Sequence, residues 1–217
     1  MIRQLYCFGL ATAVLLAGCQ GWNLRDPEVS PLTSNGETPV VNDQPAEGPL
    51  PGRLLMTPEN TQITFRGKAG LMTQSGSFQR FSGQLDLQGN RPQDAKLEVQ
   101  IEMDSVKTRI GLLTRHLKSD DFFEVDVFPT ASFVSTVIQP TESPNRYQVQ
   151  GRLTIHGVTR TVTIPATIQI RANEVLMDME WIVRQTDYRM EKGAKHAKDE
   201  VPITVTASIS RNRLNRL

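Results

Sequence analysis

Cysteine is almost absent from this 217-residue sequence, which contains only two. Cys7 lies in a segment that we expect to be cleaved off, and Cys19 is expected to carry an acyl group. The mature chain is therefore predicted to have no disulfide and no free thiol, even in a compartment where disulfides form. Burial of apolar side chains alone then has to stabilise its fold.

An excess of charge is missing as well. The chain has 24 basic and 23 acidic residues, and loss of Arg3 with the first 18 residues leaves a net charge near zero. A nucleic-acid-binding surface normally needs a basic excess, so we expect no nucleic acid partner. Residues 211–217 form a small basic tail, which we interpret as a solvated end rather than a binding patch.

The usual signatures of catalysis and of metal binding are absent. The sequence contains no G-x-S-x-G, H-E-x-x-H, P-loop or dinucleotide-binding glycine pattern. Its three histidines, His116, His156 and His196, are not spaced like metal ligands. We therefore predict that the protein is not an enzyme and that it needs neither a metal ion nor a cofactor.

The first 18 residues have the features of a secretion signal. Arg3 is followed by a largely apolar stretch over residues 5–17, which is shorter than the roughly 20 residues that a helix needs to span a bilayer. The stretch ends in the sequence Leu-Ala-Gly-Cys at 16–19, which resembles the lipobox of bacterial lipoproteins. An ordinary secretion signal with an incidental cysteine is the alternative.

A lipobox implies that Cys19 becomes the first residue of the mature protein and is acylated. Two or three acyl chains would hold the protein stably at a membrane, where a single chain would not. Gln20 follows the cysteine in place of an aspartate, which in bacteria with two membranes resembles outer-membrane sorting. We therefore expect an exported lipoprotein, anchored in the outer membrane and facing the periplasm.

Proline and polar residues dominate the segment after Cys19. Seven of the 13 prolines lie between residues 20 and 58, and no hydrophobic periodicity accompanies them. Such a segment buries too little apolar area to offset the entropy that it would lose on ordering. We predict that residues 19–56 are a disordered tether, long enough to hold a domain clear of a membrane surface.

Alternation of apolar and polar residues runs through residues 57–210, a stretch with the size of one domain. Alternation with one wet face is typical of antiparallel strands. It predicts eight strands, over residues 61–66, 77–88, 96–103, 130–138, 147–155, 161–170, 174–184 and 201–209. Four short links between them are typical of hairpin turns, at residues 89–90, 144–145, 156–157 and 172–173.

One segment departs from this alternation. Ile110, Leu113 and Leu117 are spaced three and four apart, which predicts a short helical insertion within residues 105–123, between the third and fourth strands. The fold class is therefore all-β with one helical insertion. Eight antiparallel strands form a sandwich or a barrel, and an apolar helix could cover the end of a barrel. A barrel of this size is filled by its own side chains or holds one small ligand.

Motifs spread over residues 57–210 resemble those of the YceI-like family. The matching stretches are FQRFSG at 78–83, DSVKT at 104–108, HLKSDDFF at 116–123, FPTASF at 128–133, GRLTIHGVTRTV at 151–162 and RQTDY at 184–188. The resemblance implies an eight-stranded antiparallel lipocalin-like β-barrel in a secreted or periplasmic protein. It also implies that the barrel holds a polyisoprenoid chain, such as the tail of an isoprenoid quinone.

Inward-facing apolar side chains would contact such a ligand. The candidates are Ile63, Phe65, Phe81, Leu85, Leu97, Val99, Ile101, Met103, Leu113, Leu117, Phe122, Phe123, Phe133, Leu153, Ile155, Met177, Met179 and Trp181. Four small inward-facing residues are expected to leave volume for it: Gly83, Gly151, Ala166 and Ala207. Arg184, Asp187 and Tyr188 are candidates for contact with a polar head group, with an exposed ion pair and a packed tyrosine as the alternative.

Two functions are open at this point. The first is non-catalytic carriage or sequestration of a long-chain isoprenoid lipid in the bacterial envelope. The second is a structural or interaction module, in which the barrel is filled and its outer surface docks an envelope protein that the sequence does not identify. A continuous apolar cavity would favour the first function over the second.

Overall fold

Antiparallel strands account for most of the structure, a computed structural model that describes residues 52–69 and 71–211. The predictions for the signal segment, for Cys19 and for most of the tether and basic tail concern residues outside these ranges. In chain order the elements are β1 (Gly52–Met56), β2 (Thr61–Ala69), β3 (Met72–Phe78), β4 (Phe81–Leu87), η1 (Pro92–Asp94), β5 (Ala95–Glu102), η2 (Met103–Ser105), β6 (Val106–Thr108), α1 (Gly111–Lys118), β7 (Thr130–Pro140), β8 (Arg146–Ile155), β9 (Val158–Ile170), β10 (Glu174–Arg184), η3 (Thr186–Tyr188), α2 (Glu191–His196) and β11 (Glu200–Ser210).

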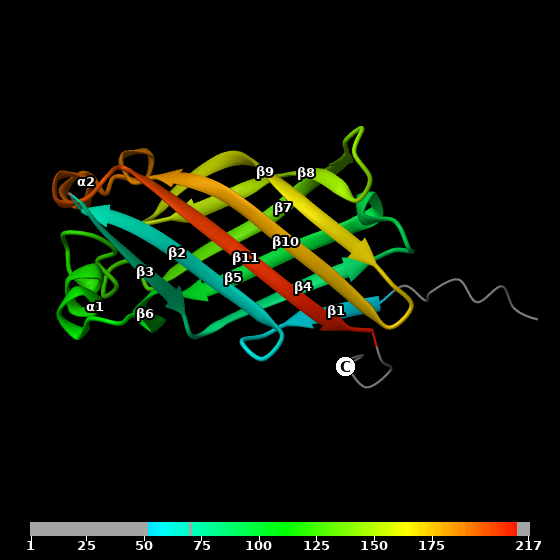
Figure 1. Ribbon diagram of the computed structural model, residues 1–217, viewed down its shortest axis with the longest axis horizontal. Coiled ribbons are helices and arrows are strands. Elements are labelled where there is room, and N and C mark those ends of the chain that lie inside the picture. The colour runs from blue at the N-terminus through cyan, green and yellow to red at the C-terminus, as the bar shows by residue number, and fades with distance from the viewer. Residues whose placement is uncertain (1–51, 70, 212–217) are drawn as a thin grey trace, which may run out of the picture. The chain divides into compact units, whose positions relative to one another are not determined.

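One sheet contains these strands in the order β1-β4-β5-β7-β8-β9-β10-β11-β2-β3-β6, with every neighbouring pair antiparallel. β3 runs into β4 through only Gln79 and Arg80. This one bent strand pairs with β2 in its first half and with β5 in its second half. The sheet therefore curls round on itself as a barrel, as Figure 1 shows.

Arg80 stabilises the bend in this strand. Its guanidinium donates to the carboxylates of Glu102 and Asp104, each at 2.6 Å. Its carbonyl oxygen accepts hydrogen bonds from the Glu102 backbone N–H at 3.1 Å and from the Ser105 hydroxyl at 3.2 Å. These hydrogen bonds join the bend to the end of β5 and to η2. They compensate for the strand pairing that is interrupted between β3 and β4.

The predicted all-β antiparallel barrel is confirmed, although the described chain has eleven strands instead of eight. β1 pairs with β4 and β2 pairs with β3, so β1 and β2 follow one another along the bent β3–β4 strand. Two positions in the barrel wall are therefore each counted as two strands. β6 adds a three-residue edge strand beside β3. The barrel wall therefore still offers eight strand positions.

The three strands that sequence reasoning missed each lack a clear pattern. β1 falls within the predicted tether and corrects its boundary, because Leu54 and Met56 are buried and pair opposite β4. The neighbouring prolines masked so short an alternation. β3 is mostly polar, and β6 lies inside the range predicted as helix.

The helical insertion is shorter than predicted. Only Gly111–Lys118 forms a helix, and Ile110 precedes it as an extended, partly exposed residue. The Thr114 hydroxyl accepts a hydrogen bond from the Thr108 backbone N–H at 3.0 Å, which ties the helix to β6. Within the described ranges, neither helix combines the length and apolarity needed to cross a bilayer.

The barrel is packed solid toward the end that carries β1. The side chains buried there include Leu54, Leu85, Leu87, Ile138, Val149, Ile168, Val175 and Ile209. Several of them are paired on neighbouring strands, such as Leu54 with Leu85 and Ile138 with Val149. The opposite end carries α1 and α2 (Figure 1).

The four predicted turn positions all connect paired antiparallel strands. The link at 156–157 is a two-residue hairpin between the paired residues Ile155 and Val158. His156 and Gly157 have positive φ values of 49° and 71°, as a type I′ turn requires. The turn prediction is confirmed, and it fixes the register of β8 and β9.

Candidate binding cavity

An apolar cavity occupies the half of the barrel nearer α1 and α2. Measured as the space that the centre of a water molecule can reach, it is about 190 Å³, whereas a single buried water needs roughly 10–15 Å³ on that measure. Side chains from strands around the barrel and from both helical regions line it. The cavity therefore has room for many atoms of a bound molecule.

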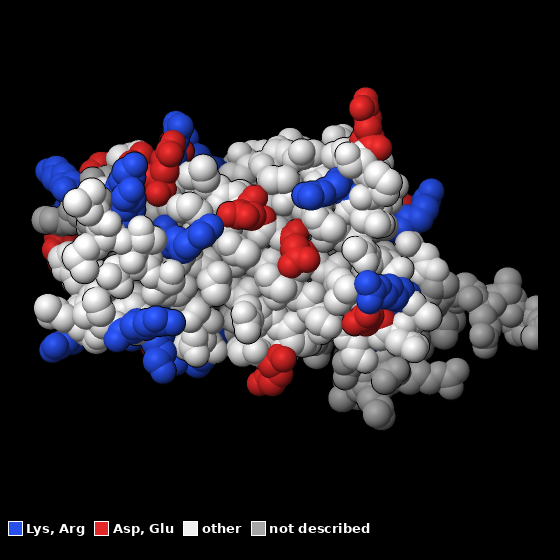
Figure 2. Space-filling view, viewed as in Figure 1, with Lys and Arg blue, Asp and Glu red and all other residues white. Residues whose placement is uncertain are grey.

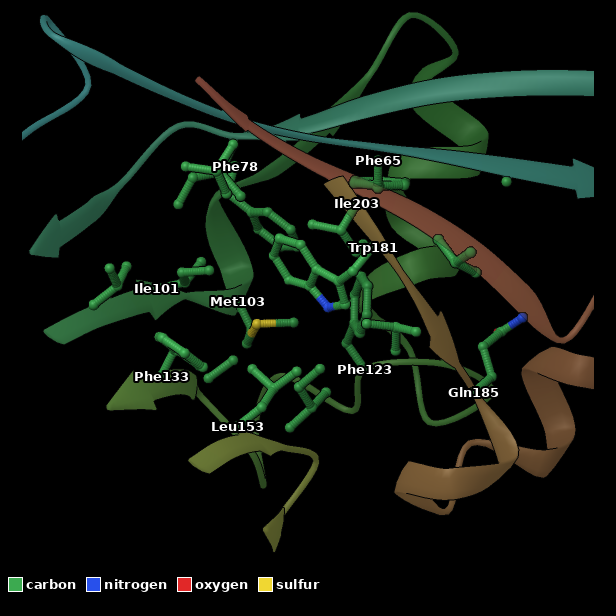
Figure 3. Close-up of a pocket in the computed structure, with 18 of the residues that line it drawn as sticks. Phe65, Phe78, Ile101, Met103, Phe123, Phe133, Leu153, Trp181, Gln185 and Ile203 are labelled. Atoms are coloured by element: carbon green, nitrogen blue, oxygen red, sulfur yellow. The ribbon is translucent and has the colours of Figure 1, made fainter. Parts of the chain in front are cut away.

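Period-two alternation aims the side chains of β10 into this cavity. Met177, Met179, Trp181 and Val183 all line it, while the residues between them face outward. Trp181 pairs with Ile203 of β11, and Ile203 pairs with Phe65 of β2. The three side chains form a continuous row across three strands, and Figure 3 shows them around the cavity.

Aromatic rings extend this row toward α1. The rings of Phe65 and Phe78 have centroids 5.6 Å apart, and those of Phe78 and Phe123 are 6.1 Å apart. Gly76 lies opposite Phe65, and a Cβ atom there would come within 2.3 Å of the Phe65 ring. The missing side chain at Gly76 therefore gives the ring its place in the cavity wall.

The chain around α1 closes the end of the cavity. Leu113 and Leu117 point inward from the helix, and Phe122 and Phe123 follow it. Gly193 of α2 packs against the ring of Phe122, where an added Cβ would lie 2.7 Å from the nearest ring carbon. We call residues 111–123 and α2 together the helical cap.

An ion pair joins the two parts of the helical cap. The Lys192 ammonium on α2 donates to the Asp120 carboxylate at 2.6 Å. This hydrogen bond is the largest cause that lowers the pKa of the Asp120 carboxyl below its ordinary value, and it raises the pKa of Lys192. Both side chains are more than half exposed, so the pair is accessible to salt.

Polar groups are few in the cavity lining. The polar or charged residues there are Lys68, Gln74, Ser132 and Gln185. Of the described lining residues, Lys68 alone is ionisable, and it is exposed. Charged side chains lie on the outer surface instead, and on the face in Figure 2 the basic ones gather toward the α1 and α2 end.

Gln185 uses its polar groups to hold the chain around α2. It is 4% exposed, and its side-chain amide donates to the Lys198 carbonyl oxygen at 2.8 Å. Its backbone carbonyl accepts from the N–H groups of Tyr188 and Met190. These bonds give Gln185 a structural role at the cavity rim.

Trp181 differs from the other lining residues that carry a polar atom. Its indole nitrogen is buried and has no hydrogen-bond partner, and among the described residues His156 is the only other one with such atoms. The His156 ring packs against Phe128 at a tilt of 48°, with ring centroids 4.1 Å apart, and its Nε2 lies 3.5 Å from a Glu124 carboxylate oxygen. His156 is outside the lining, whereas Trp181 is part of it.

Most of the side chains predicted to line a cavity do so. The sixteen that the structure brings together are Ile63, Phe65, Leu97, Val99, Ile101, Met103, Leu113, Leu117, Phe122, Phe123, Phe133, Leu153, Ile155, Met177, Met179 and Trp181. Phe81 and Leu85 are also buried, but neither is part of the lining. Both lie on β4, the half of the bent strand that leads to the packed end.

Several lining residues were missed from the sequence. They are Met56, Gly67, Phe78, Ala131, Ile164, Val183, Met190, Ala197, Val201, Ile203 and Val205, with the polar residues Lys68, Gln74, Ser132 and Gln185. Val183, Ile203 and Val205 were already on the apolar faces of predicted strands, so the alternation could have identified them. Met190 lies in a loop, where no sequence pattern indicates which way a side chain points.

The three predicted head-group contacts lie outside the cavity lining. Arg184 is exposed and pairs with Glu200 at 3.2 Å, and the Asp187 carbonyl accepts from Arg160 at 3.0 Å. Tyr188 is 3% exposed and is packed beneath them. Its burial, with the nearby Asp187 carboxylate, raises the pKa of the phenol to about 12. This arrangement matches the alternative of an exposed ion pair and a packed tyrosine.

The expectation that four small residues leave the cavity volume is wrong. None of them lines the cavity. A Cβ at Gly151 would lie 2.5 Å from the Phe133 ring, and one at Gly83 would lie 3.1 Å from Met56, so neighbouring side chains already fill those spaces. Ala166 and Ala207 are buried outside the lining. Toward the helical cap, β9 and β10 separate, since their ladder ends at the pair Ala166 and Met179 although both strands extend beyond it.

The side chains that line the cavity favour binding through shape and apolar contact. No three His, Cys, Asp or Glu side chains among the described residues are close enough to hold a metal ion. The lining has an aromatic and aliphatic surface with one unpartnered N–H. Such a surface can remove a hydrocarbon from water at about 25 cal/mol per Å² of buried area.

A family model described as the YceI-like domain matches residues 55–209. Curated relatives include a UPF0312 protein of Pseudomonas fluorescens, 36% identical over 97 residues, which are 43% of this chain and 49% of the relative. A second is a UPF0312 protein of Yersinia enterocolitica, 34% identical over 99 residues, or 46% and 50% of the two chains. The chain thus spans about half the length of these curated relatives.

Solved structures with the same fold cover more of the chain. BcnA of Burkholderia cenocepacia superimposes with a TM-score of 0.63 and 24% identity, over 69% of this chain and 95% of BcnA. A polyisoprenoid binding domain from Saccharophagus degradans, implicated in plant cell wall breakdown, gives 0.60 and 16%, over 74% and 98% of the two chains. At these identities the similarity shows a shared fold.

Proposed function

The chain belongs to the YceI-like domain family, and on that premise we propose that its cavity binds a long-chain lipid of the polyisoprenoid class. The single observation that carries the proposal is the long, almost wholly apolar lining beneath the helical cap. Burial of each methylene-sized group contributes about 0.8 kcal/mol, so a prenyl chain needs no charged anchor to bind there. The polyisoprenoid binding domain among the structural neighbours supports the same class of ligand.

The shape of the lining also suits a branched chain. Methionine side chains are flexible and polarizable, and Met103, Met177 and Met179 adapt to the irregular outline of methyl branches. The rings of Phe65, Phe78 and Phe123 offer flat apolar surface beside them. A lining of this kind favours a hydrocarbon with bends over a rigid polar ligand.

We propose further that the domain works in the bacterial envelope without catalysing a reaction. Acylation of Cys19 would anchor the chain to the outer membrane on its periplasmic side, and the proline-rich tether would let the barrel reach a lipid source. The barrel would carry or sequester a lipid that is too apolar to cross the periplasm alone.

The direct test is to identify the lipid that co-purifies with the chain. Full-length protein and a Cys19→Ala variant are purified, and an organic extract of each is examined by mass spectrometry. We expect the variant to lose the covalent acyl chains and to keep a non-covalent prenyl lipid. An extract free of prenyl lipid, from protein that also fails to bind an added one, would reject the lipid-binding function in favour of an interaction module.

A cavity-filling variant tests the location of the lipid. Gly67 lines the cavity, and a Cβ added there meets no atom within 4 Å. Gly67→Leu should therefore fold normally while it fills part of the cavity and lowers the lipid content. Gly89→Leu is the matched control, because a Cβ at Gly89 also meets nothing within 4 Å and Gly89 is not in the lining. Equal lipid content in both variants would place the lipid elsewhere.

A further inference from the structure

The indole N–H of Trp181 is a buried donor without an acceptor in a wall that is largely apolar. Buried indole N–H groups usually find a hydrogen-bond partner, because leaving a polar group unpaired in an apolar environment costs free energy. An unpaired donor inside a cavity therefore calls for a partner that enters the cavity. The indole N–H donates and never accepts, so that partner has to be an acceptor.

Trp181 lies in the wall of the cavity, where its side chain can contact a bound molecule. It lies between Met179 and Val183 on β10, and its row partners Ile203 and Phe65 face the same space. Figure 3 shows the indole standing among the cavity side chains, with Met103 and Phe123 beside it. Trp181 is four positions beyond Met177 along β10, which is about 13 Å of strand length.

Water does not suit this position. An ordered buried water needs two to four polar partners, and the side chains that surround Trp181 in the row are Ile203, Phe65, Met179 and Val183. A ligand oxygen attached to a hydrocarbon has no such requirement, because one hydrogen bond satisfies much of its acceptor capacity and its carbon skeleton fills the rest of the space.

We propose that the Trp181 N–H donates a hydrogen bond to a neutral acceptor oxygen of the bound lipid, and so selects a prenyl lipid with a carbonyl or similar oxygen over a pure hydrocarbon and over a phosphorylated one. The proposal rests on the lipid-binding function proposed above. A phosphate would have to be buried beside a single neutral donor, since the only ionisable lining residue among those described, Lys68, is exposed. Burial of an anion without a paired cation is strongly unfavourable.

The sequence offers a clean spectroscopic reporter for this bond. Trp22 and Trp181 are the two tryptophans of the chain, so Trp22→Phe leaves Trp181 as the sole indole. The full chain with Cys19→Ala and Trp22→Phe is delipidated and given isotope-labelled tryptophan for NMR. Three probes are added in turn: a menaquinone with a geranylgeranyl side chain, geranylgeranyl phosphate and the hydrocarbon squalene.

The menaquinone should bind and move the single indole N–H resonance downfield, as a new hydrogen bond does, whereas squalene should bind without that shift. Geranylgeranyl phosphate, which has the same prenyl chain as the menaquinone, should bind more weakly. Menaquinone binding without a downfield shift, or equal binding of the phosphate, would overturn the proposal. If none of the three probes binds, the lipid-binding function itself fails, so the two failures are distinguishable.

Trp181→Phe adds an independent measurement in the same background, with binding followed by calorimetry. Loss of the N–H should lower the ratio of menaquinone affinity to squalene affinity about tenfold. Loss of ring area alone would weaken both probes in parallel and leave the ratio unchanged, which would contradict the proposal. The NMR experiment on the unsubstituted Trp181 still tests the proposal if this variant does not fold.

Discussion

Gly151 shows how strongly single residues shape the interior of the barrel. It lies on β8 and is buried, and the ring of Phe133 from β7 occupies the space in which its side chain would be. The Val134 carbonyl oxygen approaches the same point at 2.6 Å. Backbone and ring together leave the position no room to adjust, so glycine here is a packing requirement.

Gly151→Ala is therefore expected to destabilise the domain. Forcing an extra methyl into a packed interior costs about 1–3 kcal/mol, which urea unfolding would measure as a lower midpoint. Gly89→Ala is the control, because a Cβ there meets no atom within 4 Å, and it should change stability by less than about 0.5 kcal/mol. Equal midpoints for the two variants would contradict the contact geometry.

Tyr188 gives a residue-scale prediction that depends on pH. Burial raises the pKa of its phenol to about 12, while in the unfolded chain the pKa is about 10. Because the unfolded state releases the proton first, the stability that the neutral phenol contributes is complete below pH 10 and is lost as the pH rises toward 12.

As the pH rises from 10 to 12, the urea midpoint for unfolding of the unmodified chain should fall. The fall should be smaller for Tyr188→Phe. The phenolate absorbance of the folded protein, followed during the same titration, should appear at higher pH than that of the unfolded protein. A tyrosine that ionises at the same pH in both states would rule out the linkage.

The helical cap covers one end of the cavity. α1 is only eight residues long, and it holds its place through contacts at both ends rather than through helix propensity. Phe122 packs on Gly193, and Lys192 pairs with Asp120 across the two parts of the cap. Parts of a fold held by so few contacts open more readily than the sheet beneath them.

Lys192→Gln should loosen this cap with little effect on global stability. An exposed ion pair adds little to global stability, so the unfolding midpoint should change only slightly. Lipid exchange between the protein and vesicles should become faster, and the difference from the unmodified chain should shrink in high salt. Lys195→Gln removes the same charge from the same helix and serves as the control. Identical exchange rates for both variants would mean that the ion pair does not restrain the cap.

At the scale of the whole molecule, the barrel is divided into a packed half and a hollow half. Toward β1, side chains such as Val149, Val175 and Ile209 are fully buried and fill the interior. Toward α1 and α2, the strands enclose the cavity. A cavity destabilises the fold, because the side chains around it lose packing contacts. The packed half supplies the stability that offsets this loss.

Hydrogen exchange should reveal this division. Backbone amides of β8, β10 and β11 near the packed residues should exchange slowest, and those of the helical cap should exchange much faster. Addition of a bound prenyl lipid should slow exchange mainly in the cap, because the ligand adds the apolar contacts that the cap lacks. Uniform protection along the barrel, with or without lipid, would contradict the division.

The sequence by itself determined the fold class and most of the cavity wall. Alternation fixes which face of each strand is buried, because a one-residue shift would turn every apolar side chain to solvent. Sixteen predicted residues, from Ile63 to Trp181, accordingly lie in the lining. The motifs that resemble the YceI-like family indicated the same fold, and the match over residues 55–209 confirms the family.

Tertiary structure alone decided where the hollow lies and how it is closed. Alternation marks Leu85 and Leu97 as equally inward, and the two residues pair across β4 and β5, yet only Leu97 lines the cavity. Which inward side chains reach the cavity depends on packing between elements that are far apart in the sequence. Arg184 is on the outward face at the end of β10, and Asp187 and Tyr188 lie in η3, so all three are outside the lining although Gln185 is part of it. The unpartnered Trp181 N–H is also a property of the assembled interior, because its surroundings in the cavity include Ile203 and Phe65 from other strands.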